Sequence, residues 1–176
     1  MKKHIFSIAI VAAGLLVAAC GNKSKDGNPQ VTDDGFEGQA PVEAALPEVK
    51  TAIDGAAASL SLPDGWIEIS SDRNIDVLKG QSIDEIGEAP SLHFEVKPVP
   101  EGKDLDGIVA MLTENPGFKA DGEMALGERV IKNFKMEGDA AASLFIDGDK
   151  FVLAMMTGAK PTDADVKAIL NSVKAK

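Results

Sequence analysis

The residue with the clearest chemistry is Cys20, the only cysteine among 176 residues. It follows the small residues Val17-Ala18-Ala19, which are typical of a signal-peptidase cleavage site and close an apolar run that starts at Ile5. The run has about 15 residues, whereas a membrane-spanning helix needs roughly 17 to 25. We therefore predict that residues 1–19 are a lipoprotein signal peptide and that Cys20 is lipidated. The alternative is an ordinary secretory cleavage before an unmodified cysteine.

A lipid on Cys20 would fix both the location and the redox chemistry of the chain. Each buried methylene contributes about 0.8 kcal/mol to membrane binding, so a diacylglycerol plus an N-acyl chain such as palmitate gives durable attachment. The sulfur would then be a thioether, which leaves no thiolate for catalysis, metal binding or a disulfide. We expect a protein that lies outside the cytoplasm and has no disulfide framework.

His93 is the one remaining histidine that could act as a general base, because His4 belongs to the predicted signal peptide. Ser70-Ser71-Asp72 contains possible nucleophiles. However, no G-x-S-x-G surrounds these residues, and turn formation through their side chains explains them better. The sequence therefore predicts no catalytic residues, and a solvated strand position is the preferred interpretation of His93.

Acidic residues are plentiful, but their spacing does not define a metal or catalytic site. Asp33-Asp34-Gly35 and Asp147-Gly148-Asp149 do not continue into a calcium-binding loop, and turn chemistry explains both. Asp84, Glu85 and Glu88 could form a catalytic carboxylate pair, although a solvated acidic surface is the preferred interpretation.

We also predict no cofactor. Met155-Met156 could suggest copper(I) ligands, but adjacent strand residues point to opposite faces, which favours core packing. The glycines do not form the phosphate-binding pattern G-x-x-x-x-G-K.

The net charge excludes one class of partner. The formal net charge is −10, and loss of the two lysines of the signal peptide makes it more negative. Nucleic-acid binding depends on neutralising phosphates with Lys and Arg, so we expect no nucleic-acid partner. For the same reason we expect no basic patch for anionic headgroups, so the lipid must supply the membrane contact.

The sequence divides into three parts: the signal peptide over residues 1–19, a segment over 20–55 and a domain over 56–176. The middle segment is rich in Gly, Asn, Asp, Pro and Gln, which predicts a disordered, flexible tether behind the lipidated cysteine. Ala44-Ala45-Leu46 and Val49 could form a short helix there or cap the domain. About 30 flexible residues span roughly 30 Å, which allows free movement above the headgroups.

Alternating apolar and polar residues predict half-buried strands at Ala58–Leu62, Trp66–Ile69 and Leu92–Val96. Leu62-Pro63-Asp64-Gly65 is a turn between the first two strands, and Trp66 is expected to anchor the core. His93 falls on the polar face of the third strand. Residues 70–90 have no clear pattern.

The centre of the sheet is predicted at Ala140–Ile146 and Phe151–Met156, because both runs are almost continuously apolar and need cover on both faces. A two-residue turn at Gly148-Asp149 places Phe145 opposite Val152 and Leu144 opposite Leu153.

Two amphipathic helices complete the prediction. Asp104 can cap the first helix, which Asn115-Pro116-Gly117 ends, and Thr162 can cap the second. The apolar positions of the helices recur at helical spacing; they are Leu105, Ile108, Val109 and Leu112, and then Val166, Ile169, Leu170 and Val173. Two helices and a sheet with doubly buried strands predict an α+β fold, an α/β/α sandwich on a largely antiparallel sheet.

With these elements in place, the chain resembles the DcrB-like bacterial envelope lipoproteins, which are similar in fold to the PsbP and Mog proteins. The resemblance depends on the signal ending in Cys20, the polar tether, the stretch Leu60–Trp66, the helix exit at Asn115–Phe118 and the final hairpin plus helix. It implies an accessory or binding role in the cell envelope, in a family associated with envelope maintenance and phage uptake. Family members can carry aspartate after the lipidated cysteine, which retains them in the inner membrane. Gly21 stands here, and implies the outer membrane facing the periplasm; the alternatives are the inner membrane or the surface of a single-membrane bacterium.

Three functions follow as hypotheses. The preferred one is a non-catalytic, lipid-anchored protein that contacts another envelope protein. The second is a small-ligand binding module with an apolar cleft between a helix and the sheet. A hydrolytic enzyme is the least favoured.

Overall fold

The computed structural model describes residues 45–70 and 74–176. Cys20, the signal peptide, Asp33-Asp34-Gly35 and most of the predicted tether lie outside the described residues, and so do Ser71 and Asp72. Within the described residues, no helix has the length and apolar character needed to cross a bilayer.

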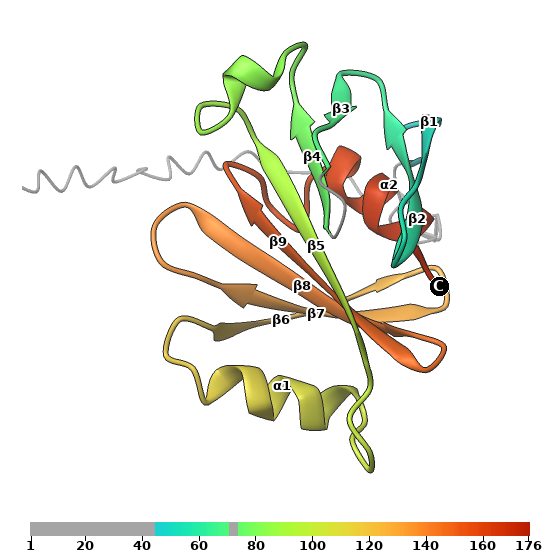
Figure 1. The fold of residues 1–176 in the computed structure, drawn as a ribbon. Helices are drawn as coiled ribbons and strands as arrows, with labels where there is room; N and C mark the ends of the chain where they lie inside the picture. Colours follow the sequence, from blue (N-terminus) through green and yellow to red (C-terminus); the bar gives the residue numbers. More distant parts are fainter. Residues whose placement is uncertain (1–44, 71–73) are drawn as a thin grey trace, which may run out of the picture. The chain divides into compact units, whose positions relative to one another are not determined.

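The main layer is a seven-stranded antiparallel sheet (Figure 1). Its strands in spatial order are β3 (Trp66–Glu68), β4 (Ile75–Lys79), β5 (Ser91–Pro98), β9 (Lys150–Thr157), β8 (Ala140–Asp147), β7 (Arg129–Lys135) and β6 (Lys119–Leu126). The two most apolar strands, β8 and β9, therefore occupy the centre, as predicted. The stretch 70–90, which had no readable pattern, contributes β4 and a short 3-10 helix, η1 (Ile83–Glu85).

The β8–β9 hairpin has the predicted register. Phe145 pairs with Val152 and Leu144 with Leu153, around a turn in which Gly148 has φ +65°. That φ is readily accessible only to glycine, so the Asp-Gly-Asp-Lys sequence sets both the turn and the pairing. The prediction is confirmed.

The two helices cover opposite faces of the sheet. α1 (Leu105–Thr113) places Ile108 against Leu144 and Leu153, while α2 (Ala164–Ser172) places Ile169 in a cluster with Phe145 and Val152. Since adjacent strand residues point to opposite faces, the alternation at 144 and 145 divides the core into two layers. The α/β/α arrangement on an antiparallel sheet is confirmed.

The caps of the two helices differ from each other. Asp104 caps α1 as predicted, and its carboxylate accepts a hydrogen bond from the Gly107 amide at 2.8 Å. For α2 the prediction of Thr162 is wrong by one position, because Asp163 is the N-cap residue. The Asp163 carboxylate accepts from the Lys160 amide at 2.9 Å, so it closes the preceding turn instead of bonding to the helix.

A second sheet, which the sequence did not reveal, has the order β1-β2-β10. Its strands are β1 (Val49–Asp54), β2 (Ala58–Pro63) and β10 (Lys174–Ala175). β1 lies inside the segment assigned to the tether, so the predicted boundary at residue 56 is too late. Ile53 is buried opposite Leu60, and Leu46 packs against the same core, which favours the capping alternative over a short helix for Leu46 and Val49; Ala44 lies outside the described residues.

The junction of β3 with α2 carries a pH-dependent contact. Trp66 is buried, as predicted, and its indole N–H lies 3.4 Å from a carboxylate oxygen of Asp165, which also accepts from the Lys79 ammonium at 2.8 Å. The Lys79 hydrogen bond, aided by Trp66, lowers the pKa of Asp165 below its ordinary value. The ionised carboxylate also faces the positive end of α2.

Asp165→Asn is expected to lower the free energy of unfolding at pH 7 by up to about 1 kcal/mol. Because the native pKa is depressed, this stabilisation is complete above the pKa of the unfolded aspartate, about 3.9, and disappears as the pH falls through the native pKa. Urea unfolding of both proteins from pH 7 to pH 2.5 measures the difference. A difference in the free energy of unfolding between the two proteins that stays constant from pH 7 to pH 2.5 would contradict a stabilising role of the ionised Asp165 carboxylate.

Candidate functional site

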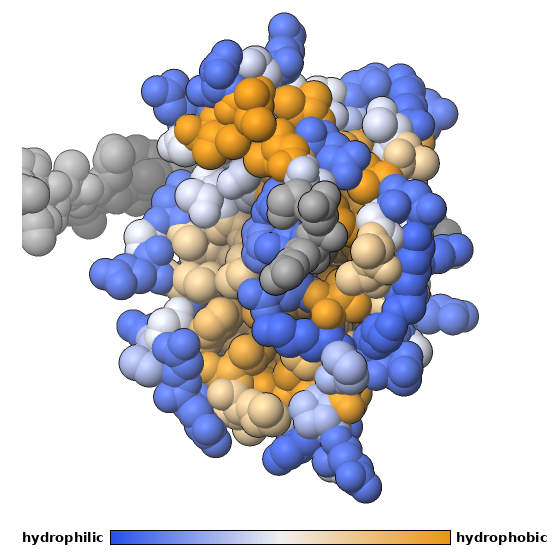
Figure 2. All heavy atoms as spheres, in the orientation of Figure 1, coloured by the Kyte–Doolittle hydropathy of each residue, from blue (hydrophilic) through white to orange (hydrophobic). Residues whose placement is uncertain are grey.

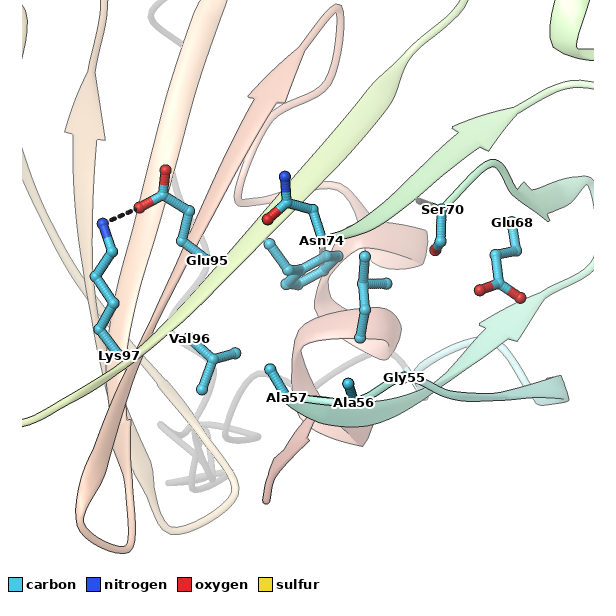
Figure 3. Close-up of a pocket in the computed structure, with 11 residues that line it drawn as sticks. Gly55, Ala56, Ala57, Glu68, Ser70, Asn74, Glu95, Val96 and Lys97 are labelled. Atoms are coloured by element: carbon cyan, nitrogen blue, oxygen red, sulfur yellow. Dashed lines mark hydrogen bonds and ion pairs between the residues drawn. The ribbon is translucent and has the colours of Figure 1, made fainter. Parts of the chain in front are cut away.

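A cleft of about 350 Å³ lies between the loop that follows β1 and the strands β4 and β5 (Figure 3). The backbone of Gly55–Ala57 forms one side, and Val96 and Lys97 of β5 form part of the other. Ile75 and Phe94, both buried core residues, contribute apolar surface. The cleft therefore offers an apolar base between two short stretches of chain.

Polar side chains gather at the rim of this cleft. Glu68, Ser70 and Asn74 come from β3 and from the two ends of the β3–β4 connection (Figure 3). Ser70 Oγ accepts a hydrogen bond from the Asp76 amide at 3.3 Å, while Glu95 forms an ion pair with Lys97, two residues further along the same strand. Glu68 has no ion-pair partner among the described residues. The rim can thus accept hydrogen bonds from a ligand at several points.

The cleft depends on a glycine at position 55, because β4 approaches the backbone closely there. A Cβ atom at Gly55 would lie 2.9 Å from both Cγ1 and Cδ1 of Ile75, a distance that requires displacement of the isoleucine. We expect Gly55→Ala to lower the free energy of unfolding by about 1–3 kcal/mol, the usual cost of overpacking a core.

Urea unfolding measures this cost, and the double variant Gly55→Ala/Ile75→Val supplies the control. Valine lacks the Cδ1 atom that the new methyl group meets, but Ile75→Val by itself costs about 0.5–1.5 kcal/mol at a buried position. The single variant Ile75→Val therefore completes the cycle, and Gly55→Ala should cost less in the Ile75→Val background than in the unaltered protein. Equal costs of Gly55→Ala in the two backgrounds would show that the contact with Ile75 is not the cause.

His93, the predicted general-base candidate, forms a pair with Asp76 instead of with a nucleophile. The two residues are opposite each other on β5 and β4, and His93 Nδ1 lies 2.6 Å from Asp76 Oδ1. The second ring nitrogen is 3.9 Å from Glu95 Oε1. Among the described residues, no hydroxyl group forms a hydrogen bond with the imidazole. The ring is half-buried, so the prediction of a strand position with one polar face holds.

The other candidates have structural contacts. Glu85 closes a capping box with Ser82, and Asp147 bonds to Arg129 and to the Ala175 amide. Met155 and Met156 point to opposite layers, since Met156 packs in the α2 layer and Met155 against the α1 layer. No cluster of three His, Cys, Asp or Glu side chains suited to a metal ion occurs in the part of the chain that the structure describes.

Sequence reasoning missed three residues that shape this region: Gly55, Asn74 and Asp76. Asn74 and Asp76 lie in the stretch without a clear pattern, so their neighbours in space were unknown. Asp54-Gly55 is a turn signal that pointed to the start of the cleft, but it fell inside the predicted tether.

Comparisons with known proteins give similarity of structure only. No protein-family model and no curated protein matches the sequence. A crystal structure from Bacteroides thetaiotaomicron is 14% identical with a TM-score of 0.43; the match covers 74% of this chain and 48% of the other, so the chain spans about half the length of that protein. The solution structure of cyanobacterial PsbP (CyanoP) from Synechocystis is 12% identical with a TM-score of 0.41. That match covers 80% of this chain and 99% of the other. At these values the similarity assigns neither a family nor a function.

Proposed function

We propose that this protein is a non-catalytic, lipid-anchored component of the cell envelope that acts by direct contact with another envelope protein. The observation that supports it most directly is the position of His93. Its imidazole is held by Asp76 on a sheet face, and no hydroxyl group among the described residues bonds to it. A general base needs a proton to abstract within hydrogen-bond reach, in the protein or in a substrate placed by a site.

The remaining polar candidates support the same conclusion. Ser70, Glu85 and Asp147 are each engaged by backbone amides, so their side chains stabilise turns and strand ends.

The lipid anchor and the membrane location are inferred from the sequence. Lipid on Cys20 would hold the chain on a membrane, and Gly21 favours the outer membrane over the inner one. The envelope role, with its link to envelope maintenance and phage uptake, is inferred from the resemblance to DcrB-like proteins. The acidic charge fits an attachment that depends on acyl chains and not on anionic headgroups.

A lysine-reactive crosslinker applied to intact cells tests the protein contact. The full-length chain is expected to give one reproducible adduct with an envelope protein, which mass spectrometry identifies. A protein that stays uncrosslinked and monomeric across growth conditions would contradict the proposal.

The cleft supports a second candidate, a binding site for a small molecule, although it lies between a loop and strands and not, as expected from the sequence, between a helix and the sheet. Its apolar base and its hydrogen-bonding rim suit a ligand with an apolar body and polar groups at one end. A ligand present at 100 times its Kd stabilises a protein by about 2.7 kcal/mol, which a thermal-shift screen detects readily. A broad screen without any rise in Tm would count against this function.

A further inference from the structure

Two isoleucines on the η1 segment are the most exposed large apolar side chains that the structure describes. Ile83 is 58% exposed and Ile86 is 56% exposed. Figure 2 shows apolar surface gathered at the top of the molecule, over the segment that carries η1 in Figure 1. We call the surface formed by Ile83 and Ile86, together with the acidic residues Asp84 and Glu88, the isoleucine patch.

The segment that carries the patch is held by hydrogen bonds at its ends and within the loop. Its ends are joined by a hydrogen bond from the Lys79 amide to the Pro90 carbonyl at 2.8 Å. Inside the loop, Glu85 Oε1 accepts from the amides of Gln81 and Ser82 at 3.0 and 3.1 Å, and Ser82 Oγ accepts from the Asp84 amide at 3.2 Å.

Gly80 makes room for this arrangement. A Cβ atom at that position would lie 2.6 Å from the Glu85 carboxylate, so a larger residue would push the capping glutamate away. The isoleucines are thus exposed on a turn that its own hydrogen bonds stabilise, which lowers the cost of ordering the loop when it binds through them.

The charge around the patch narrows the choice of partner. Asp84 lies between the two isoleucines in the sequence and Glu88 two residues after the second, and neither forms an ion pair with a described residue. Anionic headgroups would be repelled by these carboxylates. A symmetric contact with a second copy would place the same acidic residues against each other, which is also unfavourable.

We propose that the isoleucine patch is the surface through which this protein docks onto its envelope partner, and that the partner offers an apolar pocket bordered by Lys or Arg. This proposal rests on the proposed function and specifies where the contact occurs. The isoleucines fill the pocket, while Asp84 and Glu88 pair with the basic border and fix the orientation.

Crosslinking with matched variants tests the surface. The full-length Ile83→Ser/Ile86→Ser variant is expected to lose about tenfold or more of the partner adduct formed with the lysine-reactive crosslinker. The Met111→Ser/Val130→Ser variant is the control, because those side chains are 45% and 48% exposed on other elements and should leave the adduct unchanged. Thermal unfolding of both variants checks the fold, and a Tm close to that of the unaltered protein is expected because all four positions are exposed.

A photo-reactive residue identifies the chemistry of the contact. Benzoylphenylalanine at position 83 should crosslink to a segment of the partner that contains Lys or Arg, and Asp84→Lys/Glu88→Lys should weaken the same adduct about tenfold. Placed at position 130, the same residue should not give the adduct.

Four outcomes would overturn the patch as the docking surface. They are an undiminished adduct in Ile83→Ser/Ile86→Ser, an equal loss in the control variant, a position-83 adduct with a second copy of the chain, and a position-83 adduct with phospholipid alone. In the first case the protein contact itself stands, since the adduct is still formed elsewhere. If the unaltered chain forms no adduct, the proposed function fails together with the patch.

Discussion

Cys20→Ser is expected to move the protein from the membrane fraction into the soluble fraction. Two or more acyl chains, at about 0.8 kcal/mol for each buried methylene, make attachment durable, and serine removes the sulfur that would carry the diacylglycerol. The acidic chain has no basic patch in its sequence to replace that attachment. Fractionation of cells that express each protein measures the transfer.

Ser24→Ala is the matched control, because it changes a nearby hydroxyl and leaves Cys20 in place. Mass spectrometry of the mature amino-terminal peptide gives an independent reading, since lipidated Cys20 adds the mass of a diacylglycerol and an N-acyl chain. An unmodified thiol at Cys20 in the mature protein would disprove the anchor.

Arg129→Met should produce the largest loss of stability among the polar residues, about 2–4 kcal/mol, because one guanidinium satisfies several partly buried acceptors. Its Nη1 donates to the Leu170 carbonyl at 3.1 Å, and its Nη2 donates to the Val173 carbonyl at 2.6 Å. The last carbonyls of a helix lack partners within it, so Arg129 completes the end of α2 and complements its dipole.

The same guanidinium also binds the sheet. Nη2 lies 3.2 Å from a carboxylate oxygen of Asp147, and the guanidinium carbon lies 5.0 Å from the centre of the Phe145 ring. Arg129→Lys should recover little of the stability lost in Arg129→Met. An ammonium group lacks the planar arrangement of donors with which the guanidinium reaches both the end of α2 and Asp147.

Urea unfolding compares these variants with Lys135→Met on the same strand. Lys135 is 72% exposed and pairs with Asp121 at 3.4 Å, so its loss should cost less than about 1 kcal/mol. Similar losses for Arg129→Met and Lys135→Met would show that the contacts with α2 contribute little.

The candidate site was less predictable than the fold. The sequence indicated that His93 lies on a polar strand face, but its partner Asp76 is 17 residues away in a stretch without periodicity. Pairing between strands brings these side chains together, and no local signal encodes which residue of β4 faces a given residue of β5. The cleft has the same origin, because Gly55 meets Ile75 only after β1 has folded back onto β2.

The sequence by itself determined the elements whose signals are local. The glycine turn and the apolar runs specified the β8–β9 register, and Asp104 with the spacing of Leu105 and Ile108 specified α1. Alternation at Leu144 and Phe145 then required a helix on each face.

Only the tertiary structure decided the β1-β2-β10 sheet. β10 has two residues, and Ala175 pairs with Ala58 across more than a hundred positions, so its pairing exists only because α2 delivers the chain end beside β2. β1 buries Ile53 on that sheet and otherwise exposes most of its side chains, which is why its sequence resembled a tether. Elements that gain their stability from distant contacts leave little trace in local sequence, because the free energy that orders them comes from the surfaces they meet.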